Sequence, residues 1–88
     1  MKIQHQQNTE QGTFFILDDS GNKIAHLDYI FESPKRINAH HTYVSETLRG
    51  QGVADKLYQA LTQFVREKQL NLHPTCSYIA KKWERENR

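Results

Sequence analysis

The chain has little cysteine and no long apolar run. Its single cysteine, Cys76, cannot form an internal disulfide, which fits a reducing cytoplasm. No stretch approaches the ~18 consecutive apolar residues that span a bilayer. The first residues, 1–8, are polar and do not resemble a secretion signal. These shortages lead us to expect a cytoplasmic protein that is not inserted in a membrane.

The charges of the chain are nearly balanced. Lysine and arginine number 12 against 10 acidic residues, which gives a formal net charge of +2. So small an excess creates no field of one sign across the surface, and no groove-reading helix or aromatic RNA motif is recognisable. We therefore expect no nucleic-acid partner. At 88 residues the chain is predicted to form one domain, residues 1–88, without room for a second substrate domain.

The first half of the chain shows the apolar alternation of strands separated by turns. Strands are predicted over residues 12–18, 23–32 and 36–44, with a weaker edge strand over 2–7. In the second of these, one face carries Ala25, Leu27, Tyr29 and Phe31, and the other carries Ile24, His26, Asp28 and Ile30. Alternation over 36–44 predicts that Ile37, Ala39, His41 and Tyr43 share one side.

The period changes to that of an amphipathic helix after Gly52. The apolar stripe of this helix is Val53, Ala54, Leu57, Tyr58, Leu61, Phe64 and Val65. A short strand over 70–75 and a final helix over 77–87 follow. The predicted fold class is α+β, or mixed α/β, with antiparallel hairpins first and a helical crossover later.

Two glycines, Gly50 and Gly52, stand directly before the long helix. Glycine lets the backbone turn tightly and approach an anion, and the first N–H groups of a helix attract negative charge. Arg49 would add a cation. The spacing does not match a P-loop, and Asp55 occupies the third glycine position of a dinucleotide-binding fingerprint, where an acidic side chain beside a pyrophosphate is unfavourable. From these residues alone, an anion-binding loop and a plain connection both remain open.

The segment Arg49-Gly50-Gln51-Gly52-Val53-Ala54 resembles the [Q/R]-x-x-G-x-[G/A] signature of the GNAT superfamily of N-acetyltransferases. In combination with His41-Thr42, Val44 and Cys76-Ser77-Tyr78, it resembles the very small, single-domain GNAT-like proteins. The resemblance implies a minimal GNAT-like fold, with a mostly antiparallel sheet of about five strands, a long helix and a C-terminal helix. It also implies that acetyl-coenzyme A is the cosubstrate. The residues expected to bind it are Thr42, Val44, Arg49, Gly50, Gln51, Gly52, Val53 and Ala54.

Cys76 and His41 are the sharpest candidates for chemistry. Cys76 would begin the final helix, where a thiol's pKa is lowered, and the resemblance places it near the thioester. His41 could accept a proton from Cys76 or from an amine, which permits acyl transfer through an acetyl-cysteine. A buried cysteine and a hydrogen-bonded histidine are the structural alternative. Tyr78 could be a general acid toward the leaving thiolate, or could serve in packing.

No metal site is expected, because zinc bound through His41, His73 and Cys76 would need a spacing unlike known structural sites. The sequence thus predicts an acetyl-coenzyme A-dependent N-acetyltransferase with an unidentified amine or protein acceptor. A non-catalytic module that binds or senses acyl-coenzyme A is the alternative, because the N-terminal helices that shape the acceptor site in full-length relatives are missing here. The oligomeric state is left open by the sequence.

Overall fold

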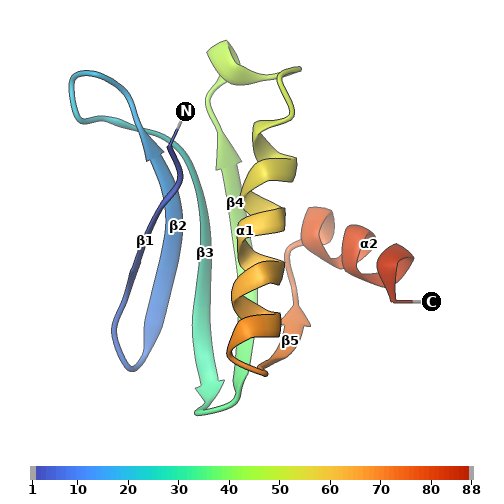
Figure 1. Ribbon diagram of the computed structural model, residues 1–88. Coiled ribbons are helices and arrows are strands. Elements are labelled where there is room, and N and C mark those ends of the chain that lie inside the picture. The colour runs from blue at the N-terminus through green and yellow to red at the C-terminus, as the bar shows by residue number, and fades with distance from the viewer. Residues whose placement is uncertain (1, 88) are drawn as a thin grey trace.

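The computed structural model describes residues 2–87 and consists of one sheet with two α-helices (Figure 1). In chain order the elements are β1 (Gln4–Gln7), β2 (Gln11–Leu17), β3 (Lys23–Ser33), β4 (Arg36–Val44), a 3₁₀ turn (Glu46–Leu48), α1 (Val53–Glu67), β5 (Asn71–Pro74) and α2 (Ser77–Glu86). Every strand and helix predicted from the sequence is present, including the weak edge strand. Within the described part of the chain, neither helix is both long and apolar enough to cross a membrane.

The five strands lie in the order β1-β2-β3-β4-β5. The first four pair antiparallel with their neighbours, whereas β5 pairs parallel to β4. Parallel neighbours need a crossover, and α1 supplies it. The α+β class and the mostly antiparallel sheet predicted from the sequence are confirmed.

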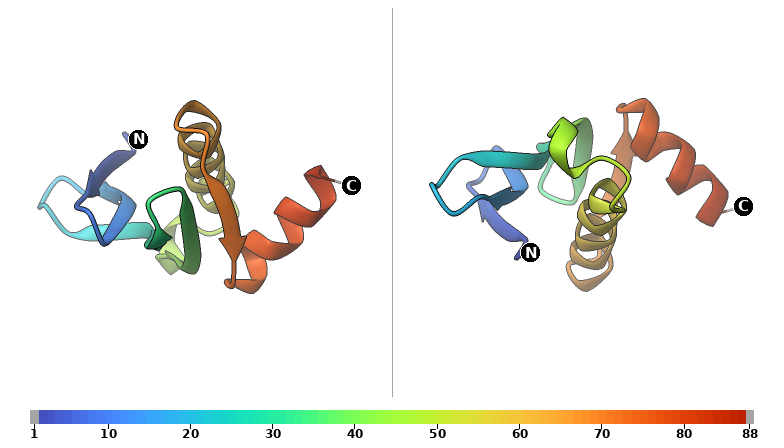
Figure 2. Two further views of the ribbon diagram at one scale, coloured as in Figure 1. Left: turned by 90° about the horizontal axis from the view of Figure 1, so that it is seen from below. Right: turned by 90° about the horizontal axis from the view of Figure 1, so that it is seen from above.

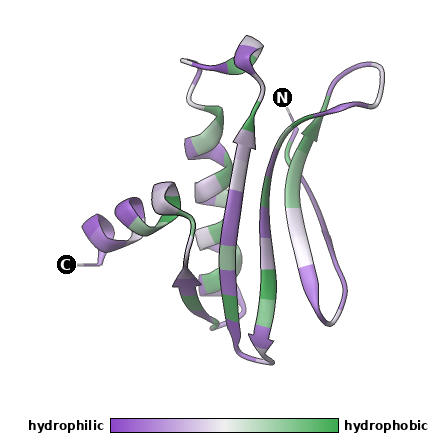
Figure 3. Cartoon of the chain, turned by 180° about the vertical axis from the view of Figure 1, so that it is seen from behind, coloured by the Kyte–Doolittle hydropathy of each residue, from purple (hydrophilic) through white to green (hydrophobic). Residues whose placement is uncertain are grey.

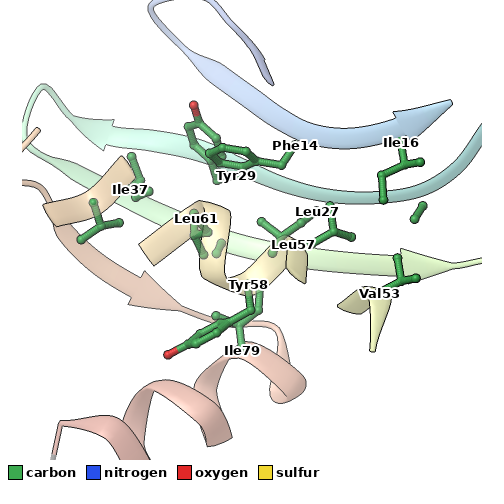
Figure 4. Close-up of a cluster of buried hydrophobic side chains, with 13 residues drawn as sticks. Phe14, Ile16, Leu27, Tyr29, Ile37, Val53, Leu57, Tyr58, Leu61 and Ile79 are labelled. Carbon is green, nitrogen blue, oxygen red and sulfur yellow. The ribbon is translucent and has the colours of Figure 1, made fainter. Parts of the chain in front are cut away.

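The hydrophobic core lies between one face of the sheet and α1. Alternate residues of β3, namely Ala25, Leu27 and Tyr29, are fully buried on this face. They pack against the apolar stripe of α1, where Leu57 and Leu61 are also fully buried (Figure 4). Every second residue of β3 and the apolar stripe of α1, which repeats every 3.6 residues, therefore form a single interface.

The opposite face of the sheet is not covered by either described helix. Seen along the strands, α1 lies on one side of the sheet, and α2 projects beyond the β5 edge (Figure 2). Seen from behind, the strands lie in front of α1 with no helix over them (Figure 3). This uncovered side is called the open face below.

A β-bulge in β4 changes which side chains reach the open face. Tyr29 lies opposite Ala39, but the preceding residue, Asp28, lies opposite His41, so His40 is an extra residue in β4. The prediction that His41 shares a side with Ala39 is wrong for this reason. Strict alternation cannot anticipate an inserted residue.

Beyond the bulge the two sides of β4 are exchanged relative to the prediction. Thr42 pairs with the buried Leu27, so it points to the α1 side. His41 pairs with Asp28 and points to the open face, and Tyr43, which is 43% exposed, is on that side too. The bulge therefore assigns Thr42, and not His41, to the side of β4 on which the crossover helix packs.

Candidate active site and cofactor groove

The strands β4 and β5 separate halfway along β4 (Figure 1). Their pairing ends where Ala39 meets Pro74. The amides of Thr75 and Cys76 both donate to the carbonyl of Ala39, each at 3.0 Å, and the chain then turns into α2. In the described part of the chain, residues 40–44 consequently have no strand beside them on this edge. An unpaired strand edge of this kind can accept an extended ligand as an added strand.

Cys76 lies at the point where the strands separate. It is a free, half-buried cysteine at the N-cap of α2. Its thiol donates to Thr42 Oγ1 at 3.6 Å, a long contact of the kind that sulfur makes. The structure thus brings Cys76 together with Thr42 and sends His41 to the other face of β4. The predicted partnership of Cys76 and His41 is not formed, and a role for either residue in acetyl transfer stays a prediction.

The glycine loop before α1 has the backbone conformation that only glycine adopts easily. Gly50 has φ +84° and Gly52 has φ +73°, both in the left-handed region. Among residues 2–87, the amides of Gly50, Gly52, Val53 and Ala54 donate to no backbone carbonyl. The loop therefore presents several unpaired N–H groups at the positive end of a 15-residue helix.

These amides border a hollow of about 200 Å³. It is lined by Val44, Leu48, Arg49, Gly50, Gly52, Val53, Ala54, Asp55 and Tyr78. Six of the eight residues predicted to bind the cofactor are among them. The other two lie elsewhere, since Thr42 contacts Cys76 and the exposed Gln51 donates its side-chain amide to the carbonyl of Thr47 at 3.3 Å.

The acidic side chain in this hollow is paired with a lysine. Asp55 accepts a hydrogen bond from Lys82 of α2, and this bond lowers the pKa of Asp55 and raises the pKa of Lys82. The lysine ammonium also lies over the rings of Tyr58 and Tyr78, at 5.4 and 5.7 Å from their centroids. The negative charge of Asp55, which is unfavourable beside a bound anion, is therefore balanced by Lys82. Sequence reasoning did not pair Lys82 with Asp55, because that contact depends on how α2 packs against α1.

Tyr78 joins the two parts of the site. It follows Cys76 by two residues and lines the hollow beside the glycine loop. Burial raises the pKa of its phenol, an effect that the nearby Lys82 partly offsets. The phenol is therefore protonated at neutral pH, as an ordinary tyrosine also is.

The comparisons with known proteins agree with this geometry. Residues 13–88 match the family model described as GCN5-related N-acetyl-transferase. Protein NATD1 of Danio rerio is 33% identical over 81 residues, which cover 92% of this chain and 72% of that protein. The NMR structure of a GCN5-like protein from Staphylococcus aureus is 36% identical with a TM-score of 0.74, covering 98% of this chain and 80% of that one.

A more distant structure shares the fold alone. It is AAC(6')-Iy in complex with the bisubstrate analogue CoA-S-monomethyl-acetylneamine, 18% identical with a TM-score of 0.62. The match covers 90% of this chain and 61% of that one. The resemblance based on the loop, the strand before it and the cysteine segment is thus confirmed, and the chain belongs to the GCN5-related N-acetyltransferase family.

Proposed function

We propose that this protein binds acetyl-coenzyme A at residues 49–54 and transfers its acetyl group to an amine. The observation that carries the proposal is the glycine loop, where two left-handed glycines leave four amides at the start of α1 without a backbone partner among residues 2–87. Such a group of N–H donors at a helix N-terminus suits a pyrophosphate. Arg49 borders the same hollow and adds a positive charge.

The rest of the cofactor would follow the free edge of β4. From the loop, the pantetheine arm would run beside residues 40–44, where main-chain groups are free to pair with its amides. Its thioester would then lie near Cys76 and Thr42, where β4 and β5 separate. This path uses the predicted positions Thr42 and Val44 as strand-edge contacts.

For the chemical step we propose direct attack by the amine. The neutral amine nitrogen forms a bond to the thioester carbonyl carbon and loses one proton to solvent, the C–S bond breaks, and coenzyme A leaves as a thiolate. Tyr78 lines the same hollow, and its phenol, protonated at neutral pH, would give its proton to that thiolate and regain one from solvent. A covalent route through Cys76 needs a base at the thiol, and among residues 2–87 the thiol is hydrogen-bonded to the Thr42 hydroxyl and to no imidazole.

Release of free coenzyme A thiol tests this function. We expect thiol release from acetyl-coenzyme A when an accepted amine from a panel of amines and peptides is present. Cys76→Ala should keep most of this turnover, and the intact mass of the wild-type protein should show no acetyl adduct. An adduct that Cys76→Ala abolishes would replace direct attack by the acetyl-cysteine route. Binding without thiol release from any acceptor would favour the acyl-coenzyme A-binding module instead.

The ion pair between Lys82 and Asp55 gives a separate prediction. Lys82→Ala leaves the Asp55 carboxylate unbalanced beside the pyrophosphate, so we expect acetyl-coenzyme A to bind about 3- to 10-fold more weakly. Lys81→Ala is the matched control, because Lys81 is exposed and makes no such pair among the described residues. Calorimetric titration measures both. Adding Asp55→Asn to Lys82→Ala should restore most of the affinity; if it does not, charge balance at Asp55 is not the reason.

A further inference from the structure

The open face carries a polar cluster that takes no part in the cofactor groove. Antiparallel pairing aligns its side chains in two rows across β2, β3 and β4. One row is Thr13, Asp28 and His41, and the other is Phe15, His26 and Tyr43. Directly opposed side chains on adjacent antiparallel strands lie ~4.5–5.5 Å apart at Cβ. Asp28 therefore lies directly opposite His41, and His26 lies two residues before Asp28 on the same face of β3.

The contacts in this cluster are short and specific. His26 Nδ1 lies 2.9 Å from Asp28 Oδ2, and the His26 and His41 rings are 5.4 Å apart between centroids. One ligand atom from each of His26, Asp28 and His41 can be chosen so that all three lie within 4.8 Å of one another. Three donors bound to one zinc ion, at ~2.0–2.2 Å each, would be about 3.4 Å apart. His41 is exposed, so its imidazole can rotate over this remaining distance.

We propose that His26, Asp28 and His41 bind a divalent transition-metal ion, for which zinc is the reference. Two imidazoles and one carboxylate are the donors that zinc and its neighbours in the first transition row prefer. The ligand side chains of His26 and Asp28 are only 25% and 28% exposed, which fixes them, while His41 faces solvent. The open face leaves the remaining coordination positions to water or to a ligand.

Two further features of the structure support the site. Thr13 Oγ1 donates to Asp28 Oδ1 at 2.7 Å, so the second carboxylate oxygen is held by a neighbour that orients the ligand. The bulge at His40 is what places His41 opposite Asp28. Without that inserted residue, His41 would point to the α1 side.

The proposed ligands share only His41 with the set His41, His73 and Cys76, whose spacing is unlike known structural zinc sites. In the structure, His73 and Cys76 make contacts away from the proposed site. His73 Nδ1 lies 3.0 Å from Glu32 Oε2, and Cys76 contacts Thr42 on the α1 side of β4. A histidine and a cysteine are thus available as controls that lie outside the proposed site.

Zinc titration of the reduced protein by calorimetry tests the proposal without reference to acetyl transfer. We expect saturable binding of one ion per chain, weakened at least about tenfold by His41→Ala and by Asp28→Asn. His73→Ala and Cys76→Ser should leave the affinity unchanged. Because His41 is exposed, His41→Ala should keep the fold, which circular dichroism can check.

Cobalt gives a second readout. Co²⁺ bound by two imidazoles and a carboxylate should show visible absorption bands that excess Zn²⁺ removes, and His26→Ala should abolish them. The proposal is overturned if no saturable zinc binding occurs up to millimolar concentration. It is equally overturned if His41→Ala binds zinc like the wild type, or if His73→Ala or Cys76→Ser removes the binding.

Discussion

Replacing Gly50 and Gly52 together by alanine is expected to weaken acetyl-coenzyme A binding on the order of 100-fold. Both residues have left-handed backbone conformations, with φ +84° and +73°. An L-residue pays about 1–2 kcal/mol for this conformation, and each 1.4 kcal/mol corresponds to a tenfold change in affinity. A Cβ atom at either position would meet nothing within 4 Å, so the cost comes from the backbone and not from a clash.

Gly21 provides a matched control for this experiment. It also has a left-handed φ, +85°, with open space around its Cβ position, but it lies in the turn between β2 and β3. Gly21→Ala should therefore lower thermal stability by a similar amount per residue without changing the affinity. NMR titration of the wild type should shift the amides of Gly50, Gly52 and Val53. If the double variant binds within threefold of the wild type, the loop does not hold the pyrophosphate.

The elements of the fold could be predicted because they depend on local patterns. Alternation in β3 and the 3.6-residue stripe of α1 are visible in any short window of sequence. The predicted strand over 36–44 coincides with β4, and the long helix begins at Val53 as expected. The position of the glycine loop followed directly, since it occupies the chain between these two elements.

The interior of the site could not be predicted in the same way, because it depends on pairing between distant residues. The bulge at His40 is defined only by the pairing of β4 with β3, and it decides whether His41 or Thr42 meets Cys76. The ion pair of Lys82 with Asp55 likewise depends on where α2 lies against α1. Alternation alone places His26 and Asp28 on one face of a strand. Their position beside His41 depends on the same bulge and could not be predicted.

The placement of α2 leads to the second large effect, which is expected for Ile79→Ala. Ile79 is fully buried and is the one buried residue of α2 within the described chain. It packs beside Tyr58 of α1 (Figure 4). The Tyr58 hydroxyl donates to Glu86 Oε1 of α2 at 3.0 Å. Truncating a buried isoleucine to alanine costs about 2–5 kcal/mol, because apolar contacts are lost and a cavity remains. In a chain of this size the melting temperature should fall by at least about 10 °C.

Ile30→Ala is the matched control, because it makes the same substitution at an isoleucine that is 38% exposed on the open face. The melting temperature of the Ile30→Ala protein, measured by calorimetry, should change by only a few degrees. Because α2 carries Cys76 at its N-cap together with Tyr78 and Lys82, loosening its anchor should also weaken acetyl-coenzyme A binding. An Ile79→Ala protein with wild-type stability would mean that α2 is held by its polar contacts alone. In that case Tyr58→Phe, which removes the bond to Glu86, should be the more damaging substitution.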